Sequence, residues 1–149
     1  MNCAAFRGSL AAMDGRAIDR VFYDGHCGLC HGTVKFLVAR DPEAHFRFAP
    51  LDGPTFAALA AEAGRSELPD SLVVVRADGA WLFRSEATVH VLERLGGVWR
   101  GLGRALGLVP TALRDAGYDL VARVRRRLFG TPSDACPQLP PELAARFDP

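Results

Sequence analysis

Two cysteines three positions apart, Cys27 and Cys30, are the residues of this chain best suited to chemistry. They follow an apolar segment and the pair Asp24-Gly25, where a strand is expected to pass into a helix. This C-x-x-C spacing is typical of dithiol–disulfide exchange, because both sulfurs can meet on the first helical turn. The helix N-terminus favours a thiolate, which is the form that attacks disulfides. We expect Cys27 to attack, being nearer the helix start and the solvent, and Cys30 to resolve the mixed disulfide.

Three polar residues beside the pair have two interpretations each. Asp24 either accepts a proton from Cys30 as a general base or caps the turn by accepting backbone hydrogen bonds. His26 and His31, if protonated, would stabilise a neighbouring thiolate, or each is a solvated side chain. Of the two histidines, His26 is the better candidate for contact with a substrate.

The hydrophobic pattern predicts a mixed α/β chain. Strands are expected at 18–23, 46–49, 71–75 and 80–83, and helices at 29–40, 55–63, 86–95, 98–108 and 110–128, with Ser85 as an N-cap. This order is that of a thioredoxin-like fold, a small mixed sheet with helices on both faces. We expect a loose leader over residues 1–17 and a single domain over 18–149, with a helical extension from about residue 98.

In a thioredoxin-like site a cis-proline usually faces the cysteine pair, just before the third strand. Pro69 is the nearest candidate, although counting back from the Asp78-Gly79 turn puts Asp70 or Ser71 in that place. Pro69 and Ser71 are therefore both candidates for substrate contact.

The last long helix carries an apolar stripe and a basic cluster. Leu113, Leu120, Val121, Val124 and Leu128 are expected to pack into the core. Arg123, Arg125, Arg126 and Arg127 form either a solvated face or a docking patch for an acidic partner. Beyond this helix, Cys136 is either a third redox thiol or a small apolar filler. His45 and His90, which have no evident partner in sequence, are expected to be exposed.

Several of these segments resemble the DCC family of thiol–disulfide oxidoreductases. The family is named for an aspartate and two cysteines, which correspond here to Asp24, Cys27 and Cys30. The resemblance extends from about residue 18 to the end. It includes the segments 48–51, 71–75 with Asp78-Gly79, 84–87 and 127–130, the residues Tyr118 and Arg125, and the pair Cys136-Pro137. It implies a thioredoxin-like fold and redox activity.

Composition narrows the class of protein further. With 149 residues, 49% of them hydrophobic, the chain can form a packed core. A net charge of +1 argues against nucleic-acid binding driven by bulk charge. No apolar run is long enough to cross a bilayer, and the N-terminus does not have the pattern of a signal peptide. A cytoplasmic location follows as an expectation, and there a C-x-x-C is more often catalytic or metal-binding than structural.

The function expected from these features is thiol–disulfide exchange through Cys27 and Cys30, with no cofactor or metal. The partners would be a protein or small-molecule thiol or disulfide and an unidentified electron donor. One alternative is a non-catalytic interaction module that uses the arginine-rich helix. Another is a metal-binding protein using Cys27, Cys30 and one or two of His26, His31 and Cys136, which lacks the second closely spaced ligand pair that structural zinc sites have.

Overall fold

The computed structural model describes residues 17–65, 71–129 and 145–149. Its centre is a sheet in the order β2-β1-β3-β4, formed by β1 (Asp19–Tyr23), β2 (Phe46–Pro50), β3 (Val73–Val75) and β4 (Trp81–Phe83). Strand β1 pairs in parallel with β2 and antiparallel with β3, which in turn pairs antiparallel with β4. Within these ranges the chain also forms five helices, namely α1 (Gly28–Arg40), α2 (Pro54–Glu62), α3 (Arg84–Leu95), α4 (Gly97–Gly107) and α5 (Thr111–Phe129).

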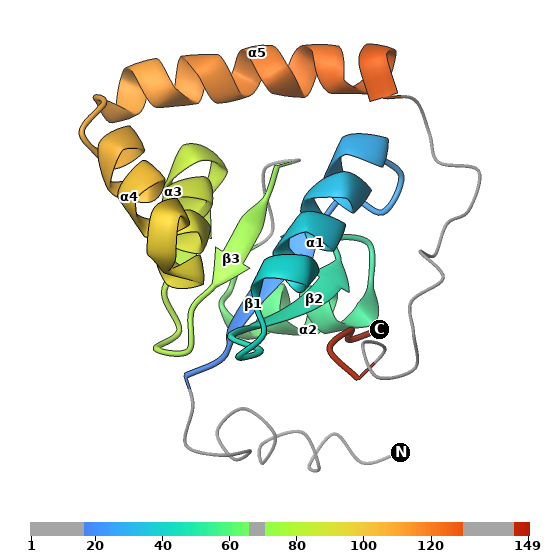
Figure 1. Ribbon diagram of the computed structural model, residues 1–149. Helices are drawn as coiled ribbons and strands as arrows, with labels where there is room; N and C mark the ends of the chain where they lie inside the picture. The colour runs from blue at the N-terminus through green and yellow to red at the C-terminus, as the bar shows by residue number, and fades with distance from the viewer. Residues whose placement is uncertain (1–16, 66–70, 130–144) are drawn as a thin grey trace, which may run out of the picture.

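Alternation along β1 divides the core into two layers, because successive side chains of a strand point to opposite faces. Val21 and Tyr23 pack with Val34 and Leu37 of α1 and with apolar residues of α3. Phe22 points the other way and packs on α2, where its ring lies 4.8 Å from that of Phe56. The sheet therefore has helices on both faces, with α1 and α3 opposite α2 (Figure 1).

This arrangement confirms the expected thioredoxin-like α/β fold, with β1–α1–β2 giving the parallel pair and β3–β4 the antiparallel pair. The expected strands and helices all occur, with ends that differ by at most two residues. Ser85, however, is not the N-cap of α3, because that position is held by Phe83. The Ser85 hydroxyl instead donates a hydrogen bond to Asp115 of α5.

Helix α5 crosses one end of the domain, above α3 and α1 (Figure 1). Its expected burial is wrong: Leu113 is 65% exposed and Val121 is 50% exposed, and Leu120, Val124 and Leu128 are also exposed. Polar contacts attach the helix to the rest of the domain. Besides the Ser85–Asp115 bond, the Tyr118 hydroxyl accepts a hydrogen bond of 2.8 Å from Leu72 N–H. The helix is therefore held against the domain without full apolar contact along its stripe.

The described C-terminal residues lie beside β2 (Figure 1). Phe48 N–H donates to Arg146 O, and Asp148 N–H donates to Phe48 O, so the segment adds a short parallel bridge at the sheet edge. Arg146 also pairs with the buried carboxylate of Asp41. These contacts join the last residues of the chain to the loop that follows α1.

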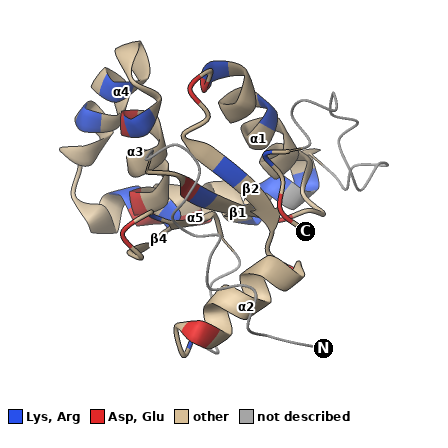
Figure 2. Ribbon diagram, turned by 90° about the horizontal axis from the view of Figure 1, so that it is seen from below, with Lys and Arg blue, Asp and Glu red and all other residues tan. Residues whose placement is uncertain are grey.

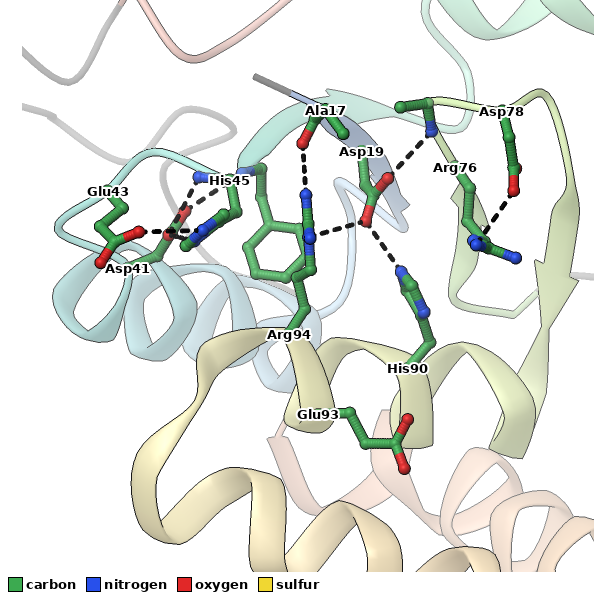
Figure 3. A network of polar contacts seen from close by, with 12 residues as sticks. Ala17, Asp19, Asp41, Glu43, His45, Arg76, Asp78, His90, Glu93 and Arg94 are labelled. Carbon is green, nitrogen blue, oxygen red and sulfur yellow. Dashed lines mark hydrogen bonds and ion pairs between the residues drawn. The ribbon is translucent and has the colours of Figure 1, made fainter. Parts of the chain in front are cut away.

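His45 and His90, expected to be exposed, are both partly buried and paired with carboxylates (Figure 3). The His90 Nε2 lies 2.8 Å from Asp19 Oδ2, and the His45 Nδ1 lies 2.9 Å from Asp41 Oδ1. Hydrophobic periodicity predicts which face of a helix or strand is buried, but it does not identify the carboxylate that pairs with a histidine. Sequence reasoning therefore missed both pairs. Lys and Arg residues occur on α1, α4, β1 and β2 as well as on α5, so basic charge is distributed among several elements (Figure 2). No described helix is both long enough and apolar enough to cross a bilayer.

Candidate active site

The cysteine pair lies where β1 passes into α1. Cys27 is the N-cap residue of α1, with φ −110° and ψ 119°, and no side-chain hydrogen bond caps the helix there. The turn before it is closed by a hydrogen bond of 3.3 Å from Cys27 N–H to Asp24 O. An N-cap sulfur adjoins the free N–H groups of the first helical turn, where the positive end of the helix dipole favours a thiolate.

The two sulfurs are neighbours, and both cysteines are free thiols that share a side-chain hydrogen bond. This confirms that the two thiols are close together. The expectation that Cys27 is the more exposed is wrong, however, because Cys27 is only 1% exposed whereas Cys30 is partly exposed. Proximity to the helix start did not predict exposure, because the turn carrying Cys27 folds into the protein.

Cys30 is held as a neutral thiol. Burial above all, and then the hydrogen bond and the charge of Cys27, raise its pKa from the ordinary 9.0 to about 12. The positive charge of Arg125 and a backbone hydrogen bond with Asp24 act in the opposite direction. Burial and the neighbouring cysteine therefore keep the Cys30 thiol protonated.

Arg125 completes the site from α5, and sequence reasoning missed it. Its side chain is buried, with a residue exposure of 5%. The Nη1 group donates to Cys30 Sγ at 3.3 Å, and Nη2 lies 3.5 Å from Asp24 Oδ2. One guanidinium thus contacts both the second thiol and the motif aspartate.

A sequence signal for this placement does exist. Arg125 follows Tyr118 and Ala122 at helical spacings of seven and three residues, so these three side chains share one face of α5. Arg123 and Arg127 lie on other faces and are exposed. Reading the arginines as one cluster concealed the difference between them.

Asp24 contacts Arg125 and also accepts a hydrogen bond within the turn that precedes α1. Its Oδ1 accepts a hydrogen bond of 2.9 Å from His26 N–H, which is an Asx-type turn. This hydrogen bond supports the interpretation that Asp24 caps the turn. Its role in proton transfer remains a prediction.

The two histidines beside the pair have different surroundings. The His26 side chain is 71% exposed and lies 3.2 Å from Asp52. His31 is buried, with its Nε2 2.8 Å from Gly25 O and its ring edge-on to Tyr23. Since a carbonyl oxygen can only accept, the His31 Nε2 donates this hydrogen bond, which links α1 to the turn at Gly25. Contact of His26 with a substrate remains a prediction.

Of the two residues expected opposite the pair, Pro69 lies outside the described residues. Ser71 is described and is buried, 4% exposed. Extending the β1–β3 register, in which Phe22 faces Val73, places Ser71 opposite Asp24. Within the described part of the chain, its hydroxyl has no hydrogen-bond partner. A buried hydroxyl of this kind beside the cysteine turn is a candidate for a substrate hydrogen bond.

Metal binding finds no support in the described ranges. No group of three or more His, Cys, Asp or Glu side chains gathers there in a way that could hold an ion. Cys136, one of the ligands considered above, lies outside those ranges.

Comparison with known proteins agrees with the site. A family model described as DCC1-like thiol-disulfide oxidoreductase matches residues 21–131. The chain is 33% identical over 130 residues to the uncharacterized protein YuxK of Bacillus subtilis, covering 87% of this chain and 93% of that protein. It is also 33% identical over 119 residues to the DCC family protein At1g52590, chloroplastic, of Arabidopsis thaliana, covering 78% and 67% of the two chains. No solved structure matches. From the match over most of its length and from its adjacent free thiols, we conclude that the chain belongs to the DCC1-like thiol–disulfide oxidoreductase family.

Proposed function

We propose that this protein catalyses thiol–disulfide exchange, with Cys27 as the attacking residue and Cys30 as the resolving residue. The observation that carries the proposal is the pair of hydrogen-bonded thiols at the N-terminus of α1. The family assignment supports thiol–disulfide chemistry in general. A cytoplasmic location stays a prediction.

The proposed reaction has two steps. The Cys27 thiolate attacks one sulfur of the substrate disulfide, the substrate bond breaks, and the first substrate thiol leaves with a proton. Cys30 then loses its proton and attacks Cys27 Sγ, which forms the Cys27–Cys30 disulfide and releases the second substrate thiol. The substrate gains two electrons and two protons, and the protein dithiol loses them.

Asp24 and Arg125 are suited to the second step. The high pKa of Cys30 keeps it from competing for the substrate in the first step. Once the Cys27 charge is consumed in a mixed disulfide, one cause of that high pKa disappears. Asp24, which contacts the same guanidinium as Cys30, is then the base that accepts the proton, and Arg125 stabilises the thiolate that forms.

The burial of Cys27 places a condition on this function. At 1% exposure, its sulfur meets a substrate only after the covering side chains move. Ser71, in register with Asp24, would then be near enough to contact the arriving substrate, and Pro69 and His26 remain candidates for the same role.

The test is reduction of a disulfide-bonded fluorogenic peptide by the reduced protein. We expect Cys27→Ser to abolish reduction, and Cys30→Ser to stop at a mixed disulfide visible by mass. Cys3→Ser is the matched control, which removes a cysteine far from the pair in sequence, leaves the pair intact and retains activity. Activity that persists in Cys27→Ser would overturn the proposal.

A non-catalytic interaction module is the second candidate, favoured by the apolar side chains exposed on α4 and α5. Val98 of α4 and Leu108, the C-cap residue that follows α4, are among the most exposed apolar residues. A bound partner that is captured equally by wild type and Cys27→Ser, with no disulfide reduced by either protein, would favour this candidate over the enzyme.

A further inference from the structure

A cavity of about 560 Å³ lies between α5 and the layer formed by α1 and α3. Cys30 and Arg125 both contribute to its wall, so it adjoins the cysteine pair on the side of the second thiol. Its volume is within the usual range for small-molecule sites. The exposed residues Leu113 and Val121 also line it, so the cavity is open to solvent.

The cavity exists because α5 is attached through polar contacts. The Tyr118–Leu72 and Ser85–Asp115 hydrogen bonds, and Arg125 with its contacts to Cys30 and Asp24, hold the helix over the domain. Between these attachments the apolar side chains of α1, α3 and α5 do not close on one another. The space they leave is lined by these helices but not filled by their side chains.

Some residues in the wall of the cavity carry hydroxyl groups, but these hydroxyls are hydrogen-bonded to other groups of the protein. The hydroxyls of Thr33 and Thr88 donate to the carbonyls of Leu29 and Arg84 in their own helices, at 3.0 and 3.1 Å. The Ser85 and Tyr118 hydroxyls are engaged in the contacts that hold α5. Aliphatic and aromatic side chains such as Phe36, Leu37, Val91 and Leu106 make up much of the rest. A cavity whose hydroxyl groups already have partners favours an apolar occupant.

We propose that this cavity binds a small apolar thiol, which reduces the Cys27–Cys30 disulfide by attacking Cys30. The proposal rests on the function proposed above, since it supplies the electron donor that turnover needs. The substrate disulfide and the reductant would then reach the pair from different sides.

The direction of attack follows from which sulfur leaves better. Attack on Cys30 expels Cys27, whose thiolate is favoured at the N-cap of α1. Attack on Cys27 would expel Cys30, whose pKa is about 12 in the dithiol and which is therefore the poorer leaving group. The wall position of Cys30 and the leaving ability of Cys27 thus favour the same reaction.

The proposed step balances. The apolar thiol loses its proton to solvent, its sulfur bonds to Cys30 Sγ, the Cys27–Cys30 bond breaks, and Cys27 leaves as a thiolate that takes up a proton. A second molecule of the thiol attacks the first one's sulfur, forms the apolar disulfide and releases Cys30, which is protonated. Two thiols are oxidised and the protein disulfide is reduced to the dithiol.

Gly117 offers a way to fill the cavity without disturbing the backbone. It lies on the α5 wall, and a Cβ built there meets no atom within 4 Å. Gly101 on α4 has equally open surroundings and does not line the cavity, which makes it a matched control. Both are helical glycines, so the same substitution has the same helix-propensity effect at each position.

The experiment measures reduction of the oxidised protein by benzyl mercaptan and by glutathione, compared per thiolate. We expect benzyl mercaptan to react at least tenfold faster. Gly117→Phe, and Gly117→Leu if the phenylalanine variant does not fold, should lower that rate at least tenfold and leave the glutathione rate unchanged. Gly101→Phe should change neither rate. Acid quenching and peptide mapping should find the benzyl adduct on Cys30.

A binding measurement without redox chemistry completes the test. Benzyl methyl sulfide, which cannot exchange, should raise the melting temperature of wild type and Gly101→Phe but not of Gly117→Phe. Equal rates for the two thiols, an adduct on Cys27, or no effect of filling the cavity would overturn this inference while peptide reduction persists. Failure of the proposed function is a different result, in which no thiol reduces the pair and no disulfide is reduced by it.

Discussion

Arg125 donates from Nη1 to the Sγ of Cys30 at 3.3 Å, across 95 positions of sequence. Its Nη2 lies 3.5 Å from the carboxylate of Asp24, so a buried guanidinium links the second thiol to the motif aspartate. The last helix therefore contributes directly to the site formed by the first strand and helix. The contact makes α5 part of the candidate active site as well as part of the fold.

Replacing Arg125 by methionine should raise the pKa of Cys30 further, because the positive charge that favours its thiolate is lost. We expect the resolving step to slow by on the order of tenfold, since one pKa unit is a tenfold change in thiolate. Thiolate absorbance against pH and accumulation of the mixed disulfide measure the two effects. Arg123→Met, at an exposed position of the same helix, is the control and should change neither.

Acid should destabilise the protein through Asp19. Burial raises the pKa of this carboxyl, but the hydrogen bonds from His90 and Ala77 N–H and the charges of His90 and Arg94 outweigh it, and the net shift is downward from 3.8 (Figure 3). A carboxyl with a lowered folded pKa contributes stability above its unfolded pKa and loses it as pH falls through the folded one.

Asp19→Asn should therefore lose about 1–3 kcal/mol of unfolding free energy at pH 6, and its difference from wild type should shrink towards pH 2. Urea unfolding at both pH values measures this. A difference that is the same at both would show that the charge of Asp19 contributes nothing.

Arg146→Ala should destabilise the protein by about 3–5 kcal/mol, because it leaves a buried carboxylate without its cation. Asp41 is fully buried and pairs with the Arg146 guanidinium, which also donates to Asp41 O at 3.1 Å and Phe46 O at 3.3 Å. Chemical denaturation measures the loss. Arg104→Ala, at an exposed site on α4, should change stability by less than about 0.5 kcal/mol.

Two glycines of α4 should respond oppositely to alanine. At Gly103 a Cβ would lie 2.9 Å from Glu93 Cγ and 3.0 Å from Glu93 N, because α3 and α4 approach closely there. At Gly101 it would meet nothing within 4 Å. We expect Gly103→Ala to lose about 1–3 kcal/mol and Gly101→Ala to gain about 0.5–1 kcal/mol, as judged by melting temperature and urea midpoint. Equal effects at the two positions would contradict the close packing of these helices.

Local sequence was sufficient to predict the cysteine turn. The apolar run of β1, the Asp24-Gly25 break and the C-x-x-C spacing are short-range signals, and the structure has Cys27 at the helix start with Cys30 beside it. The order of strands and helices followed from periodicity in the same way. These features depend on residues a few positions apart, where backbone geometry leaves few choices.

Tertiary packing decided the rest. Whether Cys27 or Cys30 is exposed, whether Arg125 is buried, and whether the stripe on α5 meets the core all depend on how distant segments meet. Hydrophobic periodicity gives the direction of a helix face but not the distance to the surface opposite it. Polar contacts such as Tyr118–Leu72 hold α5 over the domain, and the resulting cavity beside Cys30 is a property of the fold that no local pattern encodes.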